Sequence, residues 1–243
     1  DQPRSRGLGD VYKRQVYNNR AYVIGGLDKQ VGIECQVYTS ENNSWLFEFP
    51  SLPKGRFNSV CFVYRDSLYV FGGTDNSSNM NEIVRYDLST QNSGEWTTIA
   101  KVNEANQRGG VAFVVEDKVY AGLGEKSNGI RNGFYVSSDS LTKWELIPSI
   151  PAQLGVISSG VYDEQKKSFF MIDNDGKIWE YNLTTEQWTS RSLWIRMKNY
   201  HMFMLDGSIY ILGQDIYQKN KFTVYNPISV SYTHLRAHET EAD

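Results

Sequence analysis

A short hydrophobic segment that ends in glycine recurs along this chain, and this repeat restricts the folds that the chain can adopt. Its β-branched and aromatic residues favour β-strands. Apolar runs of this length, flanked by turn residues, are typical of strands that are buried on both faces. The full copies are residues 21–26 (AYVIGG), 68–73 (LYVFGG), 119–124 (VYAGLG) and 209–213 (IYILG), and a weaker copy (FFMID) covers residues 169–173.

Glycines close the full copies of this segment. Glycine permits backbone angles and close approaches that other residues do not. The weaker copy has Asp173 and Asn174 at this place, and the last copy has Gln214 after its single glycine. We therefore expect a structural role for Gly25, Gly26, Gly72, Gly73, Gly124 and Gly213.

Each of these segments is followed by a tyrosine and then by a tryptophan, except that the last is followed by the tyrosine alone. The tyrosines are Tyr38, Tyr86, Tyr135, Tyr181 and Tyr225. The tryptophans are Trp45, Trp96, Trp144 and Trp188, and intervals of 51, 48 and 44 residues separate them. A period of about 50 residues indicates a repeat architecture built from one unit of several strands.

This pattern resembles the kelch repeat, in which a hydrophobic strand and paired glycines precede a tyrosine and a tryptophan. The resemblance implies an all-β, kelch-type β-propeller with about four to five four-stranded blades. The first blade should retain its last three strands, and a fifth should begin near Met197 and stop after Tyr225. We expect the repeated tryptophans to occupy equivalent outer-strand positions and to be largely buried.

The two ends of the chain encode complementary strands of one oligonucleotide. Residues 5–15 (SRGLGDVYKRQ) back-translate to a DNA sequence whose reverse complement, in another frame, encodes residues 230–239 (VSYTHLRAHE). This DNA resembles a transposase adapter that is used to build sequencing libraries. We therefore assign residues 1–15 and 230–243 to non-native tails without a native packing role, and residues 16–229 to the propeller fragment. The lack of a leader sequence carries no information about localisation.

Composition excludes two classes of partner. The chain has 243 residues, 40% of them hydrophobic and 22% charged, with a formal net charge of -3. No apolar run approaches the roughly 20 residues of a membrane span. An acidic balance provides no long-range attraction for phosphate backbones. We expect a protein or glycan ligand, no nucleic acid and no membrane span.

The residues that most often carry chemistry are scarce outside the tails. His201 is the one histidine there, and Cys35 and Cys61 lack the spacing of a metal or redox motif. Asp173 and Asp175 resemble part of a calcium loop, but a hairpin turn explains them better. We expect no catalytic residue, no metal and no cofactor.

Two families of loops should meet at one face of such a propeller. Arg56 and Arg108 stand 13 and 12 residues before the strand tyrosines Tyr69 and Tyr120, so we interpret them as equivalent. Either the two guanidinium groups clamp a carboxylate, or each pairs with a neighbouring blade. The candidate ligand-binding residues are Arg56, Asn58, Arg108, Lys126, Arg131, Asn199 and Tyr200.

Two functions remain open. The first is a non-catalytic scaffold that binds a protein or glycan through its loop face. The second is a carbohydrate-active enzyme that resembles the bacterial kelch sialic-acid epimerase, a mutarotase-like activity, whose strand ends also include Gly-Leu-Gly. No catalytic residue can be transferred from that resemblance.

Overall fold

The computed structural model describes most of the chain as β-strands. The described residues are 13–27, 30–90, 92–103, 107–129, 133–138, 140–151, 159–173, 175–194, 197–215 and 217–235. Within them, a helical element with both bounds described is the short 3-10 helix η1 (Leu88–Thr90). This distribution confirms the predicted all-β class.

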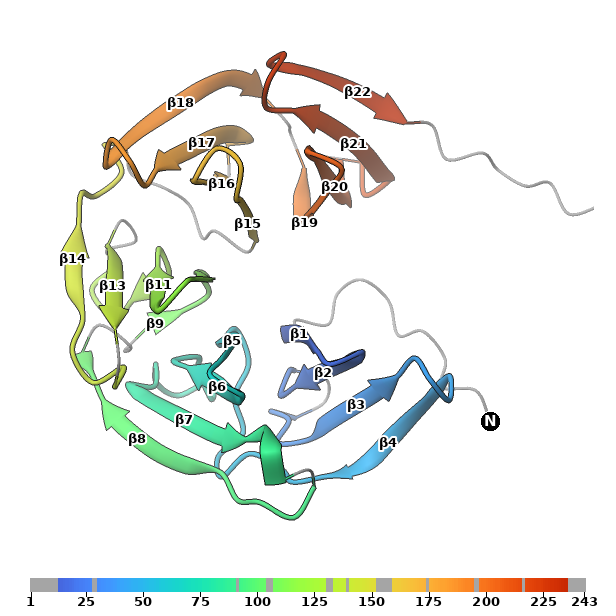
Figure 1. Ribbon diagram of the computed structural model, residues 1–243, viewed down its shortest axis with the longest axis vertical. Coiled ribbons are helices and arrows are strands. Elements are labelled where there is room, and N and C mark those ends of the chain that lie inside the picture. The colour runs from blue at the N-terminus through green and yellow to red at the C-terminus, as the bar shows by residue number, and fades with distance from the viewer. Residues whose placement is uncertain are drawn as a thin grey trace, which may run out of the picture. The chain divides into compact units, whose positions relative to one another are not determined.

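Within the described residues, the strands form five four-stranded antiparallel sheets, which we call blades 1 to 5 in chain order (Figure 1). Blade 1 contains β1 (Lys13–Tyr17), β2 (Arg20–Ile24), β3 (Cys35–Thr39) and β4 (Ser44–Phe49). Blade 2 contains β5 (Val60–Tyr64), β6 (Ser67–Phe71), β7 (Glu82–Asp87) and β8 (Thr97–Lys101). Blade 3 contains β10 (Val111–Val115), β11 (Lys118–Gly122), β13 (Phe134–Ser138) and β14 (Glu145–Ile147).

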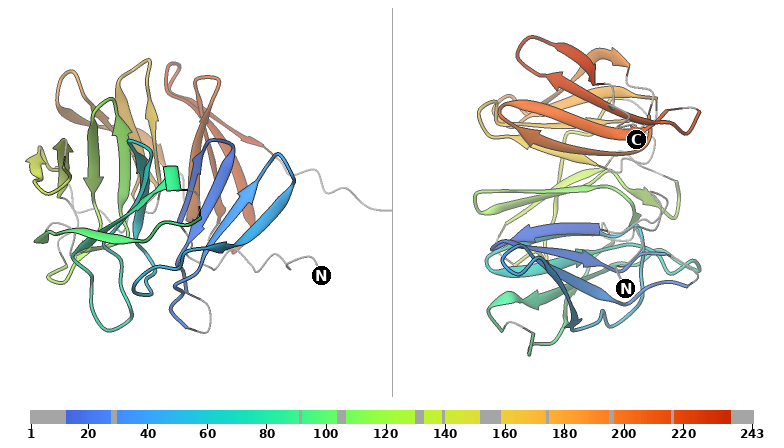
Figure 2. Two further views of the ribbon diagram at one scale, coloured as in Figure 1. Left: turned by 60° about the horizontal axis from the view of Figure 1, so that its bottom comes forward. Right: turned by 90° about the vertical axis from the view of Figure 1, so that its right-hand side faces the viewer.

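The last two blades have the same strand order. Blade 4 contains β15 (Gly160–Asp163), β16 (Ser168–Ile172), β17 (Lys177–Asn182) and β18 (Gln187–Trp194). Blade 5 contains β19 (Lys198–Leu205), β20 (Ser208–Gln214), β21 (Asn220–Asn226) and β22 (Ser231–Leu235). A small two-stranded sheet pairs β9 (Gln107–Arg108) with β12 (Glu125–Lys126). Each blade is a twisted sheet of neighbouring hairpins (Figure 2).

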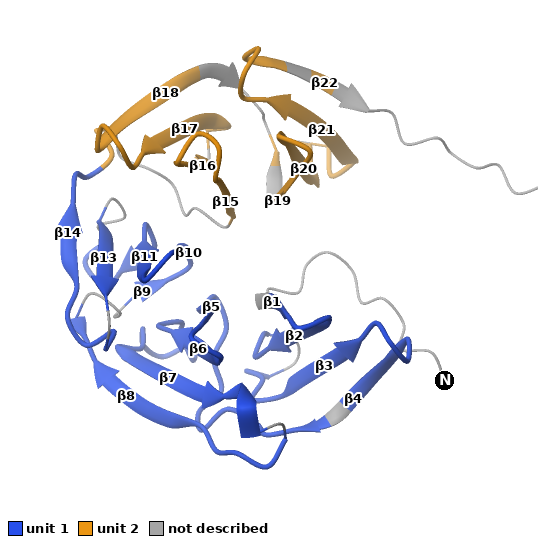
Figure 3. Cartoon of the chain, viewed as in Figure 1, with its two compact units in different colours: residues 1–149 blue, residues 150–243 orange. Residues whose placement is uncertain are grey.

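The chain divides into two compact units. Unit 1 covers residues 1–149 and holds blades 1 to 3, and unit 2 covers residues 150–243 and holds blades 4 and 5 (Figure 3). In unit 2, one hydrophobic cluster joins the two blades, with Phe170 and Ile178 from blade 4 and Met202 and Ile211 from blade 5. Unit 1 has two such clusters, one on each side of blade 2.

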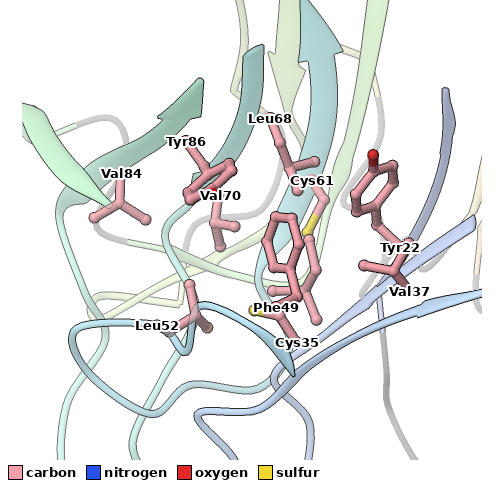
Figure 4. Packing of buried hydrophobic residues seen from close by; sticks show 11 residues of the cluster. Tyr22, Cys35, Val37, Phe49, Leu52, Cys61, Leu68, Val70, Val84 and Tyr86 are labelled. Atoms are coloured by element: carbon pink, nitrogen blue, oxygen red, sulfur yellow. The ribbon is translucent and has the colours of Figure 1, made fainter. Parts of the chain in front are cut away.

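Strand β6 explains why the repeat reads as an unbroken apolar run. All five of its residues are buried. Leu68 and Val70 belong to the cluster shared with blade 1, whereas Tyr69 and Phe71 belong to the cluster shared with blade 3. Successive side chains of a strand point to opposite faces, so a strand between two blades must be apolar at every position. Figure 4 shows the first cluster, with Tyr22, Cys35, Val37, Phe49, Leu52, Cys61, Leu68, Val70, Val84 and Tyr86.

The strand register corrects one repeat tyrosine. In blade 2, Leu68 lies opposite Tyr86. In blade 3, the equivalent Val119 lies opposite Ser137, so Tyr135 is two positions away from the repeat site. The Oγ of Ser137 donates to the carbonyl oxygen of Lys143 at 2.5 Å. The other predicted tyrosines share one position, opposite Ala21, Leu68, Phe169 and Ile209: they are Tyr38, Tyr86, Tyr181 and Tyr225.

The repeated tryptophans are not equally buried. Trp96 packs at the edge of the cluster between blades 1 and 2, and the ring of Trp144 lies 5.4 Å from that of Phe71 in blade 2. Each therefore contacts the preceding blade. Trp45 lies in blade 1, which has no earlier blade in unit 1, and it is 38% exposed. The prediction of burial is wrong for Trp45, and Trp96, Trp144 and Trp188 are each only half-buried; the Trp188 ring lies 4.8 Å from that of Tyr181.

Blades 1 and 5 each have four strands in the described residues, where three strands and an incomplete blade were predicted. Residues 13–17 pair with β2, and residues 231–235 pair with β21. The edge of a sheet presents unpaired main-chain groups that accept an extended segment of almost any sequence. Main-chain pairing therefore does not bear on the origin of the chain ends, and the assignment of residues 1–15 and 230–243 to non-native tails stays a prediction.

Candidate ligand-binding site on the loop face of unit 1

Main-chain hydrogen bonds tie the loops of neighbouring blades together at one end of unit 1. The amide of Gly26 donates to the carbonyl oxygen of Arg56 at 3.0 Å, and the amide of Gly73 donates to that of Gln107 at 2.8 Å. Phe57, the residue after Arg56, pairs with the loop that follows Gly72 and Gly73. It exchanges two hydrogen bonds of 3.0 Å with Thr74. We call this set of loops, residues 50–59, 72–81, 107–110 and 123–129, the loop face of unit 1.

These hydrogen bonds require backbone shapes that suit glycine. Gly73 has a φ of 96°, and a Cβ there would lie 3.0 Å from the carbonyl oxygen of Phe57. A side chain at this position would strain the backbone and push the loop away. The paired glycines of the repeat thus allow the close approach of two blades.

The same hydrogen bonds show that Arg56 and Arg108 are not equivalent. Arg56 and Gln107 are the residues whose carbonyls accept from the second glycine of the preceding blade. Phe57 pairs with Thr74, and Arg108 pairs with Glu125, so Arg108 corresponds to Phe57. Counting back from the strand tyrosine placed the two arginines one residue out of register.

Arg56 is completely buried, with 0% of its surface exposed. Its Nη1 donates to the carbonyl oxygen of Gly72 at 3.1 Å, and its Nη2 lies 3.5 Å from Oε2 of Glu82 in blade 2. Its Nε donates to the carbonyl oxygen of Lys54 at 3.4 Å. Burial lowers the pKa of this guanidinium, and the charge of Glu82 opposes that shift. Arg56 therefore joins its loop to blade 2.

Arg108 forms an ion pair on the surface of the loop face. Its side chain is 45% exposed, and its Nη2 and Nε lie 2.9 and 3.0 Å from the same oxygen, Oε2 of Glu125. A second surface pair joins Lys54 to Asp75 at 2.8 Å. The hydrogen bonds from Lys54, Ser77 and the Ser78 amide hold the pKa of the Asp75 carboxyl well below its usual range.

Lys126 contacts an aromatic side chain of blade 3. Its Nζ donates to the Oη of Tyr135 at 2.8 Å and lies 5.0 Å from the centre of that ring. Tyr135, displaced from the repeat position, thus contacts the loop face. Asn58 contributes its backbone, with a φ of 51° and a carbonyl oxygen that accepts from the Gly109 amide at 2.6 Å.

The other three predicted binding residues are Arg131, Asn199 and Tyr200. Arg131 is outside the described residues, as is the side chain of Asn199. Tyr200, in unit 2, is buried and donates its hydroxyl hydrogen to the carbonyl oxygen of Ile172. The structure thus gathers Arg56, Asn58, Arg108 and Lys126 in unit 1, and their role in ligand binding stays a prediction.

Sequence reasoning did not select Gln107, Glu82 or Tyr135 as candidate binding residues. Gln107 is 1% exposed, and its Nε2 is a buried donor that has no hydrogen-bond partner within the described ranges. The signal was present in the sequence as a fixed offset: β5 begins at Val60 and β10 begins at Val111, and the same offset relates Arg56 to Gln107.

Asp173 closes a hairpin turn, as predicted from the sequence. Its Oδ1 accepts from the amides of Asp175 and Lys177 at 3.0 and 2.9 Å, and its Oδ2 accepts from Nε1 of Trp179 at 2.9 Å. These donors occupy the carboxylate oxygens that a calcium ion would need. Among the described residues, no group of three or more His, Cys, Asp or Glu side chains could hold a metal ion.

Cys35 and Cys61 are buried in the cluster between blades 1 and 2, and they are not joined by a disulfide bond. Burial raises the pKa of the Cys35 thiol strongly, with a smaller contribution from Cys61. A thiol in such surroundings stays protonated and is a poor nucleophile. Separately, no described helix is long and apolar enough to cross a membrane.

Comparison with known proteins agrees with the repeat. The family model for the Kelch motif matches residues 55–103, which include blade 2. Kelch-like protein 36 of Mus musculus is 25% identical over 158 residues, which cover 60% of this chain and 25% of that protein. Kelch repeat and BTB domain-containing protein 1 of Ectromelia virus (strain Moscow) is 25% identical over 235 residues, which cover 91% of this chain and 41% of that protein. The chain therefore spans less than half of these curated relatives.

Among solved structures, the structure of YjhT matches with a TM-score of 0.76 and 14% identity, covering 93% of this chain and 84% of that chain. At this identity the likeness concerns the fold. Four-stranded blades in chain order, packed through their faces within each unit, define a β-propeller protein. Together with the Kelch motif in residues 55–103 and the recurring glycine, tyrosine and tryptophan pattern, they confirm the predicted kelch-type β-propeller fold and the resemblance to kelch-repeat proteins.

Proposed function

We propose that this chain is a non-catalytic binding module that holds a protein or glycan ligand on the loop face of unit 1. One observation carries the proposal: equivalent loop positions keep the same main-chain hydrogen bonds and change their side chains. Arg56 and Gln107 each accept from the second glycine of the preceding blade, yet one is a cation and the other an amide. A fixed backbone with variable side chains is typical of binding surfaces on rigid scaffolds.

The next position of the loop face follows the same rule. Thr74 pairs with Phe57, and Glu125 pairs with Arg108, so the residues after them, Asp75 and Lys126, are equivalent. One carries a carboxylate and the other an ammonium group. Two adjacent blades thus present opposite charges from one backbone geometry, which supports selective recognition of a polar ligand.

The test is a ligand screen on glycan and peptide arrays, followed by a pair of blocking variants. Ser78→Trp adds bulk to an exposed position of the loop face, and Lys118→Trp adds it at the first residue of β11, away from the loop face. We expect Ser78→Trp to abolish binding of the selected ligand and Lys118→Trp to leave it unchanged. Equal binding by both variants would overturn the assignment of this face.

Turnover distinguishes the module from a mutarotase-like enzyme. A sugar selected by the screen is mixed with the chain, and interconversion of its anomers or epimers is followed by proton NMR. We expect the rate to equal that in buffer alone. A rate increase that grows with protein concentration would replace the binding module with an enzyme.

A further inference from the structure

The loop face contains a buried hydrogen-bond donor that no group of the described residues satisfies. Gln107 is 1% exposed, and its Nε2 has no hydrogen-bond partner among the described residues. A buried donor that loses its contacts with water and gains none in return is destabilising. This side chain therefore needs an acceptor that the described part of the chain does not provide.

Blade 2 shows which group provides the acceptor at the equivalent place. There Arg56 donates to Oε2 of Glu82, and the carbonyl oxygen of Glu82 accepts from the Gly72 amide at 3.2 Å. In blade 3 the same main-chain bond runs from the Leu123 amide to the carbonyl oxygen of Gly133, at 2.7 Å. Gly133 is thus the equivalent of Glu82 and has no side chain. The carboxylate that satisfies Arg56 is missing opposite Gln107.

The cation beside Gln107 is Lys126. The two residues are directly paired in the antiparallel strands β9 and β12, so their side chains leave the same face of that small sheet. Arg108 and Glu125 are the other pair and bind each other. The Nζ of Lys126 contacts the Oη of Tyr135, whose ring lies over Gly133: a Cβ at Gly133 would lie 2.6 Å from that oxygen.

Charge completes the comparison between the two blades. In blade 2 the two cations of the loop, Lys54 and Arg56, are matched by Asp75 and Glu82. In blade 3 the positions of Asp75 and Glu82 are taken by Lys126 and Gly133. Both carboxylates are absent there, and a cation stands in place of one of them.

We propose that Gln107, Lys126 and Tyr135 form a binding site for one carboxylate group of the ligand. This inference rests on the proposed function and names the chemistry that the loop face recognises. The carboxylate would accept from Nε2 of Gln107 and from Nζ of Lys126. The Oη of Tyr135 accepts from Lys126, so its own hydroxyl hydrogen is available as a third donor. A single negative charge balances the ammonium group of Lys126 and replaces the missing Glu side chain.

The probe is sodium acetate, titrated into the 15N-labelled full chain while the side-chain amide signals of glutamine are followed by NMR. We expect a saturable shift of the Gln107 Nε2 signals. Gln107→Leu removes the donors at similar volume, and Lys126→Met removes the charge. Each should weaken acetate binding by about tenfold or more. Lys118→Ala, at the first residue of β11 and outside the loop face, should change it less than about twofold.

An internal carboxylate provides a second arm. The double variant Gly133→Glu with Tyr135→Ala places a Glu where blade 2 has one and removes the ring that would block it. We expect it to keep the fold, as checked by circular dichroism, and to lose acetate binding. Folded variants that bind acetate as the wild-type chain does, or a Gln107 signal that acetate does not move, would overturn the site.

Larger probes distinguish a carboxylate of an acidic side chain from that of an acidic sugar. They also distinguish failure of this site from failure of the proposed function. N-acetyl-aspartate and glucuronate represent an acidic side chain and an acidic sugar, and tighter binding of one identifies the source. A screened ligand that Ser78→Trp blocks but Gln107→Leu does not would keep the loop face and reject this site. Acetate binding that Gln107→Leu abolishes, with no ligand on the loop face, would keep the site and reject the proposed module.

Discussion

The indole Nε1 of Trp96 donates a hydrogen bond of 2.9 Å to the carbonyl oxygen of Pro50, and this bond joins blade 2 to the residue that follows the outer strand of blade 1. The Trp96 ring also lies 5.4 Å from that of Tyr86. Trp45 has a tyrosine neighbour, Tyr38, at a similar 5.5 Å, but it is 38% exposed. The two tryptophans therefore differ in the contacts that a preceding blade provides.

We predict that Trp96→Ala lowers the free energy of unfolding by about 3 kcal/mol, through lost burial and the lost Pro50 contact. Trp45→Ala should lower it by about 1 kcal/mol, because much of that ring stays in water. Urea denaturation of the two variants provides the measurement. Equal losses would show that the contact with the preceding blade adds no stability.

Two stacked aromatic pairs offer a matched test of blade packing. Phe62 and Tyr69 in blade 2 lie 5.2 Å apart with an angle of 10° between the rings, and Phe203 and Tyr210 in blade 5 have the same separation and angle. Phe62 is buried under residues of blade 3, whereas Phe203 is 42% exposed. The two ring pairs therefore have the same geometry within their blades, but Phe62 is covered by a neighbouring blade and Phe203 is partly exposed.

We predict that Phe62→Ala lowers the free energy of unfolding by about 3 to 5 kcal/mol, because it leaves a cavity between blades 2 and 3. Phe203→Ala should lower it by less than about 1.5 kcal/mol, since it loses the ring contact and little burial. Chemical denaturation of both variants, fitted with a common slope, measures the difference. A loss at Phe203 as large as that at Phe62 would mean that this face of blade 5 is covered in solution.

Substitution of each arginine of the loop face should distinguish a residue that stabilises the fold from one that forms only a surface ion pair. Arg56→Ala leaves the carbonyl of Gly72 and the carboxylate of Glu82 without their buried donor, and we expect a loss of about 2 to 4 kcal/mol. Arg108→Ala breaks an exposed ion pair with Glu125 and should cost less than about 1 kcal/mol. Thermal and urea unfolding test both. If Arg56→Ala unfolds as the wild-type chain does, Arg56 is not a structural link between loop and blade.

The Asp75 carboxyl should titrate at unusually low pH. Its folded pKa is depressed, first by the hydrogen bond from Lys54 and then by Ser77 and the Ser78 amide, whereas an unfolded Asp titrates near pH 3.9. Its stabilising effect is therefore present above about pH 4 and is lost as the pH falls through the folded pKa. Carbon-13 NMR should show the carboxylate still ionised below about pH 4.

Lys54→Ala provides the control for that titration. It removes the first of the donors, so the midpoint of Asp75 should rise toward the ordinary range. Lys118→Ala, which changes a lysine outside the loop face, should not move it. A wild-type midpoint at the ordinary value, or equal midpoints in the two variants, would contradict this account of the loop.

The strands and their repeat could be predicted from the sequence because the inner segments are short runs of mainly apolar residues. Burial between two blades demands this of β6, where Leu68 and Tyr69 face different clusters. The structural role of the paired glycines could also be predicted, because the close contact of Gly73 with Phe57 excludes a side chain. Fold class and family follow from local demands of this kind.

Register between the blades was decided by the tertiary structure. Loops of unequal length make counting from a tyrosine uncertain by a residue or two, and successive side chains of a strand point to opposite faces. One residue separates Arg108 from Gln107, and that step exchanges an exposed ion pair for a buried donor that lacks an acceptor. Two residues separate Tyr135 from Ser137, and that step moves a ring from the core to the loop face. Whether Gln107 finds an acceptor depends on Gly133, which is distant in the sequence and is brought near by the pairing of separate strands.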